Sequence, residues 1–401
     1  MLPIQTRTLV KSTAPVLQQH GETLTRHFYS RMFTHNPELR EVFNQGHQRS
    51  GTQQQALAQA VTAYAQHIDN PAVLMPVLER VAQKHVSLGI RKEHYAVVGR
   101  HLLASIGEVL GEAATPELLN AWAEAYGQLA DILTGMEQAA YDQAATQEGG
   151  WTGWRSFRLI AKQPESAEIT SFEFAPADGG SLPGYRPGQY ISVRLPVPEL
   201  GYKQPRQYSL SDAPRRDRLR ISVKREAGGD QQPQGMVSNR LHDHVQVGDL
   251  VDIAPPAGDF FLHEDSNRPV VLISAGVGIT PMIAMLEHLH ATQSTRPLRF
   301  WHACRHGDVQ AFGARVRTLV SQLPDASSWF VHEAEAGRAD AVQADAFGRL
   351  DLGEQTLPDD ADYYVCGPLG FMSAQIQTLK TRGIPAKRIH AEAFGTGGPG
   401  H

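Results

Sequence analysis

The chain has 401 residues, of which 41% are hydrophobic and 20% are charged. This is ordinary globular composition with room for two or three hydrophobic cores, and it excludes disordered, collagen-like and coiled-coil proteins. The formal net charge of -5 is spread without acidic or basic blocks. The sequence therefore predicts no nucleic-acid partner, and small molecules are the expected ligands.

No stretch approaches the ~18 consecutive apolar residues of a transmembrane helix, and the N-terminal residues lack the pattern of a secretory signal. We expect no transmembrane segment and a cytoplasmic location. The two cysteines, Cys304 and Cys366, are too few for a disulfide framework or a multi-cysteine zinc or iron–sulfur site. Any redox chemistry must therefore use another cofactor.

The first part of the chain has the periodicity of helices. Apolar residues recur at helical spacing, as in Val77, Val81 and Leu88 after Pro76, which suits the first turn of a helix. The run Asn36-Pro37-Glu38 has the residues of a helix start: a capping side chain, a proline and a carboxylate. Residues 1–147 are predicted to form an all-α domain.

The pattern changes at the polar joint Gly149-Gly150. Residues 148–262 are predicted to form an antiparallel β-barrel, because short strands alternate with Gly/Pro turns, at Trp154–Ile160, Ile169–Phe174, Tyr190–Leu195 and Leu219–Lys224. Residues 263–401 are predicted to form a parallel-sheet α/β domain. Its strands Val270–Ser274, Leu298–Ala303 and Ala361–Cys366 alternate with helices at Met282–Leu289, Phe312–Leu323 and Met372–Arg382.

The eight histidines of the helical domain raise the question of haem, because a single neutral imidazole on a helix can bind haem iron. A lone histidine is more often a surface or core residue. The haem interpretation is favoured by two runs of sequence, Lys84–Ile90 followed by Tyr95, and the earlier Pro37–Phe43. From Pro3 to about Tyr141 the sequence resembles the globin domain of bacterial flavohaemoglobins.

The resemblance implies a haem b site. It makes His85 the iron ligand, with Phe43 packed on the haem, Tyr95 and Glu137 as partners of the ligand, and Tyr29, Gln53 and Leu57 on the distal side. Leu57 lies four residues after Gln53 and so shares its helix face. The residues alone also fit core aromatics at Tyr29 and Phe43 and a solvated helix residue at Glu137.

Each of these residue types has a chemical reason to be there. A tyrosine hydroxyl can donate a hydrogen bond to O2 that has gained partial negative charge from ferrous iron. A carboxylate beside the free ring nitrogen of His85 orients the ring and increases its electron donation, so Glu137 favours oxygen activation over storage. Whether Gln53 contacts the ligand is open.

The predicted barrel carries a candidate flavin site. The run Arg206-Gln207-Tyr208-Ser209, preceded by a strand at Tyr190, resembles the RxYS motif of the ferredoxin–NADP reductase family, which implies FAD. Arginine can pair with the pyrophosphate in a bidentate manner, tyrosine offers an aromatic face, and serine offers a hydroxyl near the flavin N5. Backbone N–H groups at a second element would hold phosphate, at Gly235-Met236-Val237-Ser238. Without this context, the motif reads as a plain surface strand.

The last domain carries a candidate nicotinamide site. A strand leads into the turn and helix start Gly276-Val277-Gly278-Ile279-Thr280-Pro281. Two glycines permit close approach to a pyrophosphate, although the third glycine of the GxGxxG fingerprint is absent. The reductase family uses GxGxTP here, together with a late motif found as Cys366-Gly367-Pro368. We expect Cys366 to line the nicotinamide pocket as an inert thiol.

Three further assignments leave alternatives open. The tail Glu392-Ala393-Phe394-Gly395 resembles the family segment whose aromatic residue covers the flavin. Glu392 would then lie between flavin and haem with Lys84 facing it, or both are surface charges. Arg305, just after a strand, either accepts the 2′-phosphate of NADPH or is a solvated loop residue. The choice between NADH and NADPH is open.

Over essentially its whole length, the chain resembles the flavohaemoglobins, whose activity is nitric oxide dioxygenation. The implied partners are NAD(P)H, O2 and NO: electrons pass through FAD to keep the iron ferrous, O2 binds under Tyr29, and NO is detoxified to nitrate. The chain is expected to act as a monomer, and a lipid in the distal haem pocket is possible in this family. Two alternatives are an oxygen-binding or oxygen-sensing globin and a flavin-dependent NAD(P)H reductase of external acceptors.

Overall fold

The computed structural model describes residues 2–44, 48, 51–229, 234–335 and 343–394. The chain divides into two compact units, one made of Met1–Trp154 with Arg194–Arg206 and the other of Arg155–Val193 with Gln207–His401. No helix within these described ranges is both long and apolar enough to span a membrane. The predicted domain ends at residues 147 and 262 stay a prediction.

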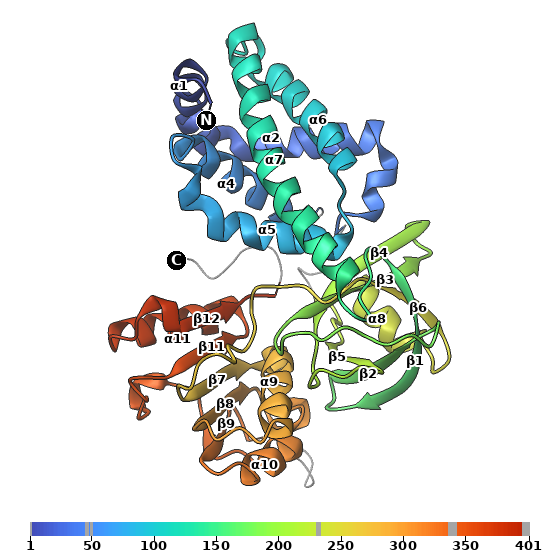
Figure 1. The fold of residues 1–401 in the computed structure, drawn as a ribbon. Helices are drawn as coiled ribbons and strands as arrows, with labels where there is room; N and C mark the ends of the chain where they lie inside the picture. The colour runs from blue at the N-terminus through green and yellow to red at the C-terminus, as the bar shows by residue number, and fades with distance from the viewer. Residues whose placement is uncertain (1, 45–47, 49–50, 230–233, 336–342, 395–401) are drawn as a thin grey trace. The chain divides into compact units, whose positions relative to one another are not determined.

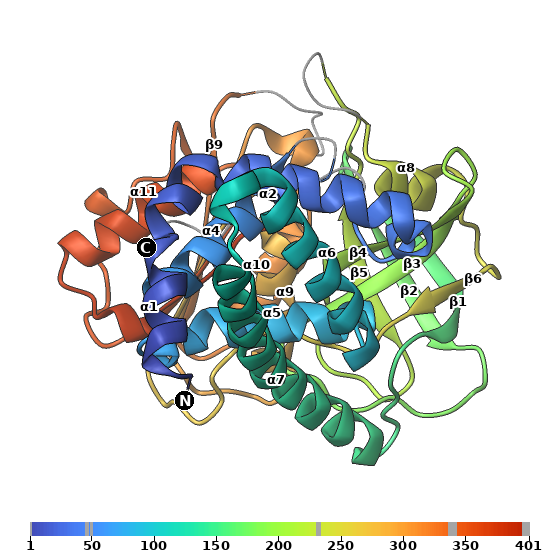
Figure 2. The ribbon, with the colours of Figure 1, turned by 90° about the horizontal axis from the view of Figure 1, so that it is seen from above.

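The first part of the chain is helical, as predicted. Its helices are α1 (Ile4–Ser12), α2 (Ala14–His35), α4 (Thr52–Gln66), α5 (Met75–Leu88), α6 (Lys92–Leu110) and α7 (Pro116–Thr146). Short 3-10 turns connect them at η1 (Pro37–Glu41), η2 (Pro71–Leu74) and η3 (Gly111–Ala113). The long α2 packs against α4 and α6, while α7 packs against α1, α5 and α6 (Figures 1 and 2).

Local sequence explains where these helices begin and end. Pro76 lies in the first turn of α5, and Gly89 ends that helix in the left-handed conformation with a φ of 72°. The Thr115 side chain accepts a hydrogen bond from the Leu118 N–H at 3.3 Å and caps the start of α7.

The capping role predicted for Asn36 is wrong. Pro37–Glu41 is a 3-10 turn, and the Asn36 side chain makes no cap hydrogen bond to it. Instead, the Asn36 amide donates to Glu38 Oε1 at 2.7 Å, and its oxygen lies 2.9 Å from His101 Nε2. The side chain is therefore used to hold the turn against α6.

Two hydrophobic clusters form the interior of this helical part. The larger one is built from α1, α2, α4, α6 and α7 around residues such as Phe28, Met32 and Trp122. The smaller one is formed mainly by residues of α5 and α7, around Leu78, Ala82 and Leu133. Their partly buried margins share Leu74 and Leu129.

The next part is a six-stranded sheet with one helix. Its elements are β1 (Arg155–Pro164), β2 (Ile169–Pro176), β3 (Tyr190–Val197), β4 (Tyr202–Ser209), β5 (Leu219–Lys224), α8 (Met236–Asp243) and β6 (Leu250–Ile253). The strand order is β4-β3-β6-β1-β2-β5, with β1 antiparallel to both β2 and β6. An antiparallel bridge between Leu210, just after β4, and Ile221 of β5 joins the two outer strands, as expected of a barrel.

The last part is a six-stranded parallel sheet covered by helices. Its strands are β7 (Val270–Ala275), β8 (Leu298–Cys304), β9 (Ala326–His332), β10 (Ala346–Phe347), β11 (Asp362–Cys366) and β12 (Ile389–Glu392), in the order β10-β9-β8-β7-β11-β12. Its helices and turns are η4 (Gly276–Gly278), α9 (Ile279–Ala291), η5 (Gly307–Val309), α10 (Gly313–Ser321), η6 (Leu352–Glu354), α11 (Leu369–Thr381) and η7 (Ala386–Arg388). Hydrophobic residues of α9 and α10 cover one face and those of α11 the other (Figure 1).

We expect Gly99→Ala to destabilise the helical part. A Cβ at Gly99 of α6 would lie 2.5 Å from the Cε1 atom of Tyr126 on α7, so the two helices would have to separate. Overpacking of this kind costs about 1–3 kcal/mol. Thermal unfolding followed by far-UV circular dichroism will show a lower melting temperature.

The matched control for this substitution is Gly135→Ala. Gly135 is an exposed position in α7 where a Cβ would meet nothing within 4 Å. This variant gains helix propensity and should melt at or slightly above the parent temperature. A Gly99→Ala protein that melts with the control would contradict the close approach of α6 and α7.

We also expect neither cysteine to react in the native protein. Cys366 is completely buried in β11, and burial raises the pKa of its thiol well above the ordinary value. Burial raises the pKa of Cys304 to about 12. Since the thiolate is the nucleophile, both groups are protonated and inert at pH 8. A disulfide-exchange reagent should label both thiols only after unfolding in guanidinium, and rapid labelling of the native protein would contradict this burial.

Candidate functional site

His85 meets two other predicted residues at the end of α5. Its Nδ1 lies 2.7 Å from Glu137 Oε1 on α7 and 2.9 Å from the Tyr95 hydroxyl on α6. The Tyr95 hydroxyl also donates to Glu137 Oε1, at 2.5 Å. Burial and the Glu137 carboxylate raise the pKa of Tyr95, so this hydroxyl keeps its proton. Three helices thus bring together the three side chains that sequence reasoning grouped.

This arrangement leaves the other nitrogen of His85 available. A ring whose Nδ1 faces a carboxylate carries its proton there, so the lone pair is on Nε2. The His85 side chain is 30% exposed, whereas Glu137 is 2% exposed. Within the described ranges, no group of three or more His, Cys, Asp or Glu side chains is placed to hold a metal ion. A single histidine ligand fits haem, whose porphyrin supplies the remaining equatorial ligands.

Tyr29 of α2 lies in the larger hydrophobic cluster. Its ring packs against Phe33, with centroids 5.9 Å apart, and against Phe43, at 5.6 Å. The Tyr29 side chain is buried, which raises its pKa, while the Gln53 side chain of α4 lowers that pKa in part. Leu57, one turn after Gln53, packs against the same cluster. The predicted distal residues are therefore together.

A further residue of this group, Gln48, was missed by sequence reasoning. Its Nε2 donates to Gln53 Oε1 at 2.9 Å, and its side chain, like that of Gln53, lowers the pKa of Tyr29 in part. Gln48 lies between η1 and α4, where no periodic pattern relates it to α2. The sequence contains no signal for this contact.

The two groups belong to different hydrophobic clusters. Tyr29, Phe43 and Leu57 pack in the larger cluster, and Tyr95 packs against the smaller one. A flat apolar group between them would meet apolar side chains on both faces and an imidazole nitrogen on one. The donor set and its surroundings therefore fit a haem.

The candidate flavin residues follow one another along β4. The guanidinium of Arg206 donates to the Pro205 carbonyl at 2.6 Å, and Gln207 Nε2 donates to Ser192 Oγ of β3 at 3.3 Å. Arg206, Gln207 and Tyr208 are half-buried, and Ser209 is buried. The run is thus more enclosed than a plain surface strand.

Two glycines near this strand allow close contacts, one with an aromatic ring and one at the start of a helix. A Cβ at Gly258 would lie 2.9 Å from Tyr190 Cε1, so that glycine lets the Tyr190 ring lie on the backbone. Gly235 precedes α8, and a Cβ there would lie 2.3 Å from Ser238 Oγ. Val237, in the same turn, is buried.

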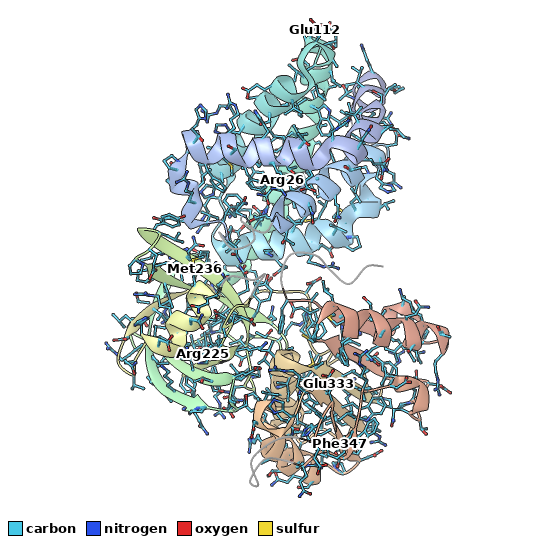
Figure 3. All side chains as sticks on the ribbon, turned by 180° about the vertical axis from the view of Figure 1, so that it is seen from behind. Arg26, Glu112, Arg225, Met236, Glu333 and Phe347 are labelled. Atoms are coloured by element: carbon cyan, nitrogen blue, oxygen red, sulfur yellow. The ribbon has the colours of Figure 1, made fainter. Side chains whose placement is uncertain are left out.

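Both ends of α8 are held in place. Met236, labelled in Figure 3, opens the helix. Ser238 Oγ donates to the Gly235 carbonyl at 3.2 Å. At the other end, Arg225 forms a bidentate ion pair with Asp243, the last residue of the helix. The N-terminal N–H groups of such a helix can hold phosphate.

The two candidate nicotinamide motifs meet at the carboxyl ends of neighbouring strands. Ser274 of β7 pairs with Cys366 of β11 in parallel register. A Cβ at Gly278 would lie 2.3 Å from the Cys366 carbonyl oxygen, so this close backbone approach requires glycine there. A Cβ at Gly367 would lie 3.0 Å from the Phe371 ring and 3.2 Å from the Cβ of Ala275, so that position is tightly packed. This edge is where open α/β sheets bind their ligands.

The turn itself is closed by hydrogen bonding. Gly276 adopts a φ of 54°, and Thr280 Oγ1 donates to the Val277 carbonyl at 3.0 Å. The first turn of α9 is buried, at Ile279, Thr280 and Pro281. Pro368 stands immediately before α11, as a proline suited to a helix start does.

The remaining predicted residues lie at the ends of strands. Glu392 closes β12 and pairs in register with Cys366, while Phe394 is 44% exposed. Gly395 is outside the described residues. Arg305 is exposed and forms an ion pair with Glu168 in the turn between β1 and β2, so it is not simply solvated. The predicted facing of Lys84 and Glu392 stays a prediction, as does the 2′-phosphate role of Arg305.

Comparison with known proteins gives the same three parts. The Globin family model matches residues 26–133, the model described as Oxidoreductase FAD-binding domain matches 156–262, and the Oxidoreductase NAD-binding domain model matches 272–377. A flavohemoprotein of Bordetella parapertussis is 59% identical over 403 residues, which cover 99% of this chain and 100% of that protein.

Two solved structures are also similar. The flavohemoglobin of Malassezia yamatoensis, with bound FAD and heme, has a TM-score of 0.87 and 31% identity, covering 98% of this chain and 100% of that one. The flavohem-like FAD/NAD-binding domain of nitric oxide dioxygenase from Vibrio cholerae has a TM-score of 0.55 and 41% identity, covering 60% of this chain and 98% of that one.

These similarities confirm the predicted fold class and the predicted haem, FAD and nicotinamide cofactors. The chain is an oxidoreductase that belongs to the flavohemoprotein family.

Proposed function

We propose that this chain is a nitric oxide dioxygenase, which uses electrons from NAD(P)H to convert NO and O2 to nitrate and so detoxifies NO. The observation that carries the proposal is the contact of His85 with the buried Glu137 carboxylate at 2.7 Å. The FAD/NAD-binding domain of a Vibrio cholerae nitric oxide dioxygenase, similar to the second half of this chain, adds support. A monomer acting in the cytoplasm is part of the same proposal.

When bound, haem supplies an iron atom that binds O2, and FAD exchanges the two electrons of NAD(P)H for single electrons. Glu137 accepts a hydrogen bond from the Nδ1–H group of His85. This bond orients the imidazole and makes its Nε2 a stronger electron donor. The Tyr95 hydroxyl holds the carboxylate in this position. Strong donation favours oxygen activation, whereas reversible oxygen storage does not require it. An attached reductase likewise favours continuous turnover over storage.

On the distal side, the proposal assigns the hydrogen-bond donor to Tyr29. The buried Tyr29 hydroxyl keeps its proton at neutral pH, because burial raises its pKa. Phe33 and Phe43 pack against the ring and limit its movement. A donor held in a fixed position stabilises a distal ligand that carries negative charge.

The other half of the chain supplies the electrons in this proposal. Arg206, Tyr208, Ser209 and the N-terminal turn of α8 would hold FAD, which passes electrons on one at a time. The turn Gly276–Gly278 and Gly367, with the neutral thiol of Cys366, would hold the nicotinamide cofactor that supplies them. Roles for Glu392, Phe394 and Lys84 in electron transfer are part of the same proposal.

The first test measures the loss of dissolved NO in aerated buffer containing the haem- and FAD-loaded protein with NADPH or NADH. We expect rapid loss that requires both O2 and reduced nicotinamide, with nitrate as the product. No loss despite electron transfer from flavin to haem would contradict the proposal. Oxygen sensing or reduction of external acceptors would then account for the protein better.

His85→Ala should abolish both haem retention and NO consumption, because it removes the axial ligand. The Soret absorption of the purified variant and its NO consumption measure these two effects. His67→Ala is the control, since His67 is an exposed residue just after α4 and should leave both unchanged. A normal haem spectrum in His85→Ala would show that another residue binds the iron.

Tyr29→Phe should accelerate O2 release from the reduced protein about tenfold, the expected effect of losing one hydrogen bond to a charged ligand. Stopped-flow displacement of O2 by carbon monoxide measures this rate. Tyr64→Phe is the matched control, because the Tyr64 hydroxyl is also buried but donates to the Ala125 carbonyl. Equal O2 release from both variants would exclude Tyr29 as the distal donor.

A further inference from the structure

Arg305 lies at the carboxyl edge of the parallel sheet, directly after β8. In this sheet β7 lies between β8 and β11, so the turn Gly276–Gly278 after β7 comes between Arg305 and Cys366 at the end of β11. A dinucleotide with its pyrophosphate at this turn and its nicotinamide beside Cys366 would extend its adenosine ribose towards the end of β8. Arg305 is therefore a residue that the 2′-phosphate of NADPH would approach.

The Arg305 guanidinium is paired with a carboxylate of the antiparallel sheet. It forms an ion pair with Glu168, which lies in the turn between β1 and β2. The side chains of Arg305 and Glu168 are 57% and 30% exposed, so a nucleotide at this edge could reach both groups. Because exposed ion pairs contribute little to stability, the main effect of this pair is on the charge that a bound molecule meets.

Hydrogen bonds hold the turn that carries Glu168 in place. The Ala167 N–H donates to the carbonyl of Asp308 in η5 at 2.8 Å, which joins the turn to the segment that follows β8. Ser166 Oγ accepts from the N–H groups of Glu168 and Ile169, at 3.3 and 3.1 Å. The turn could move away only by breaking such bonds, so the Glu168 carboxylate stays at the end of β8.

Two further carboxylates belong to segments at this edge. Asp308 lies in η5, and Glu333, labelled in Figure 3, follows β9 and donates its N–H to the Cys304 carbonyl at 3.0 Å. A phosphate monoester carries about two negative charges at pH 7, so an edge with these carboxylates and that of Glu168 disfavours it. The 2′-hydroxyl of NADH is uncharged and meets no such repulsion.

We propose that Glu168 is a specificity-determining residue that makes NADH the preferred electron donor over NADPH, because it neutralises Arg305 and repels a 2′-phosphate. The inference rests on the nicotinamide site of the proposed function, and it does not depend on the reaction with NO. An arginine at this edge of a nucleotide-binding sheet suits a 2′-phosphate, which it can bind through two parallel hydrogen bonds. The ion pair with Glu168 withholds those donors from the nucleotide.

Glu168→Gln tests this role by removing the charge at constant size. Anaerobic stopped-flow mixing of the haem- and FAD-loaded protein with NADH or NADPH gives the second-order rate constant of flavin reduction by each nucleotide. We expect the parent protein to favour NADH about tenfold, and Glu168→Gln to lower the ratio of the two rate constants about tenfold. A parent protein without a preference for NADH, or a Glu168→Gln protein with the parent ratio, would overturn the proposal.

Three further variants separate the charge of Glu168 from its packing. Glu168→Asp keeps the charge and should keep most of the preference for NADH. Glu199→Gln is the same loss of charge at an exposed position between β3 and β4, and it should match the parent ratio. Combining Arg305→Gln with Glu168→Gln should remove the gain for NADPH, because the guanidinium that receives the phosphate is then absent. A double variant that keeps the full gain would overturn the part assigned to Arg305.

Binding of adenosine 2′,5′-bisphosphate to the oxidised protein gives a readout without turnover. In calorimetric titrations we expect Glu168→Gln to bind this probe about tenfold more tightly than the parent does, and equal affinities would overturn the proposal.

The same experiments distinguish this inference from the proposed function. If the flavin shows the expected ratio while no NO is consumed, the proposed function fails and the role of Glu168 stands. If NO is consumed while Glu168→Gln keeps the parent ratio, the role of Glu168 fails and the dioxygenase proposal stands. If neither nucleotide reduces the flavin, the nicotinamide site fails and with it the role of Glu168.

Discussion

The functional centre of the helical part depends on one buried carboxylate. Glu137 is almost completely buried, and an unpaired charge in such a place would cost several kcal/mol. Its Oε1 contacts both the His85 ring nitrogen and the Tyr95 hydroxyl, so the groups that stabilise the charge are those that orient the ring. Because the three residues lie on α5, α6 and α7, the packing of these helices and the chemistry of His85 are inseparable.

In the parallel-sheet part of the chain, the absence of a side chain allows two backbone segments to approach closely. At the edge formed by β7 and β11, the Cys366 carbonyl oxygen and the Gly367 nitrogen lie 2.3 and 2.8 Å from where a Cβ of residue 278 would be. Glycine at 278 removes that conflict and lets the two motifs meet at the edge where open α/β sheets bind their ligands. Cys366 at this edge is completely buried, and burial raises the pKa of its thiol; its place in the nicotinamide pocket stays a prediction.

The two sides of the proposed haem site use polar groups in opposite senses. On the His85 side a charged acceptor draws a proton towards itself, which increases electron donation from the ring. On the Tyr29 side, burial raises the pKa of a hydroxyl that keeps its proton. In the proposed function, both arrangements stabilise negative charge on a distal ligand, which suits oxygen activation better than oxygen storage.

Much of the fold and of the site could be predicted from sequence, because the relevant signals are local. The periodicity of Val77, Val81 and Leu88 after Pro76 predicts the helix that carries His85. The run Gly276–Pro281 predicts a strand, turn and helix start. The role of Asn36, the ion pair of Arg305 with Glu168, and the network of Gln48, Gln53 and Gln54 were decided by the tertiary structure. These contacts join segments without a common periodicity, and the direction of an amide depends on which acceptor packing brings beside it. The sequence by itself therefore determined the elements and cofactor motifs, whereas packing between helices and loops decided which proton each polar side chain presents.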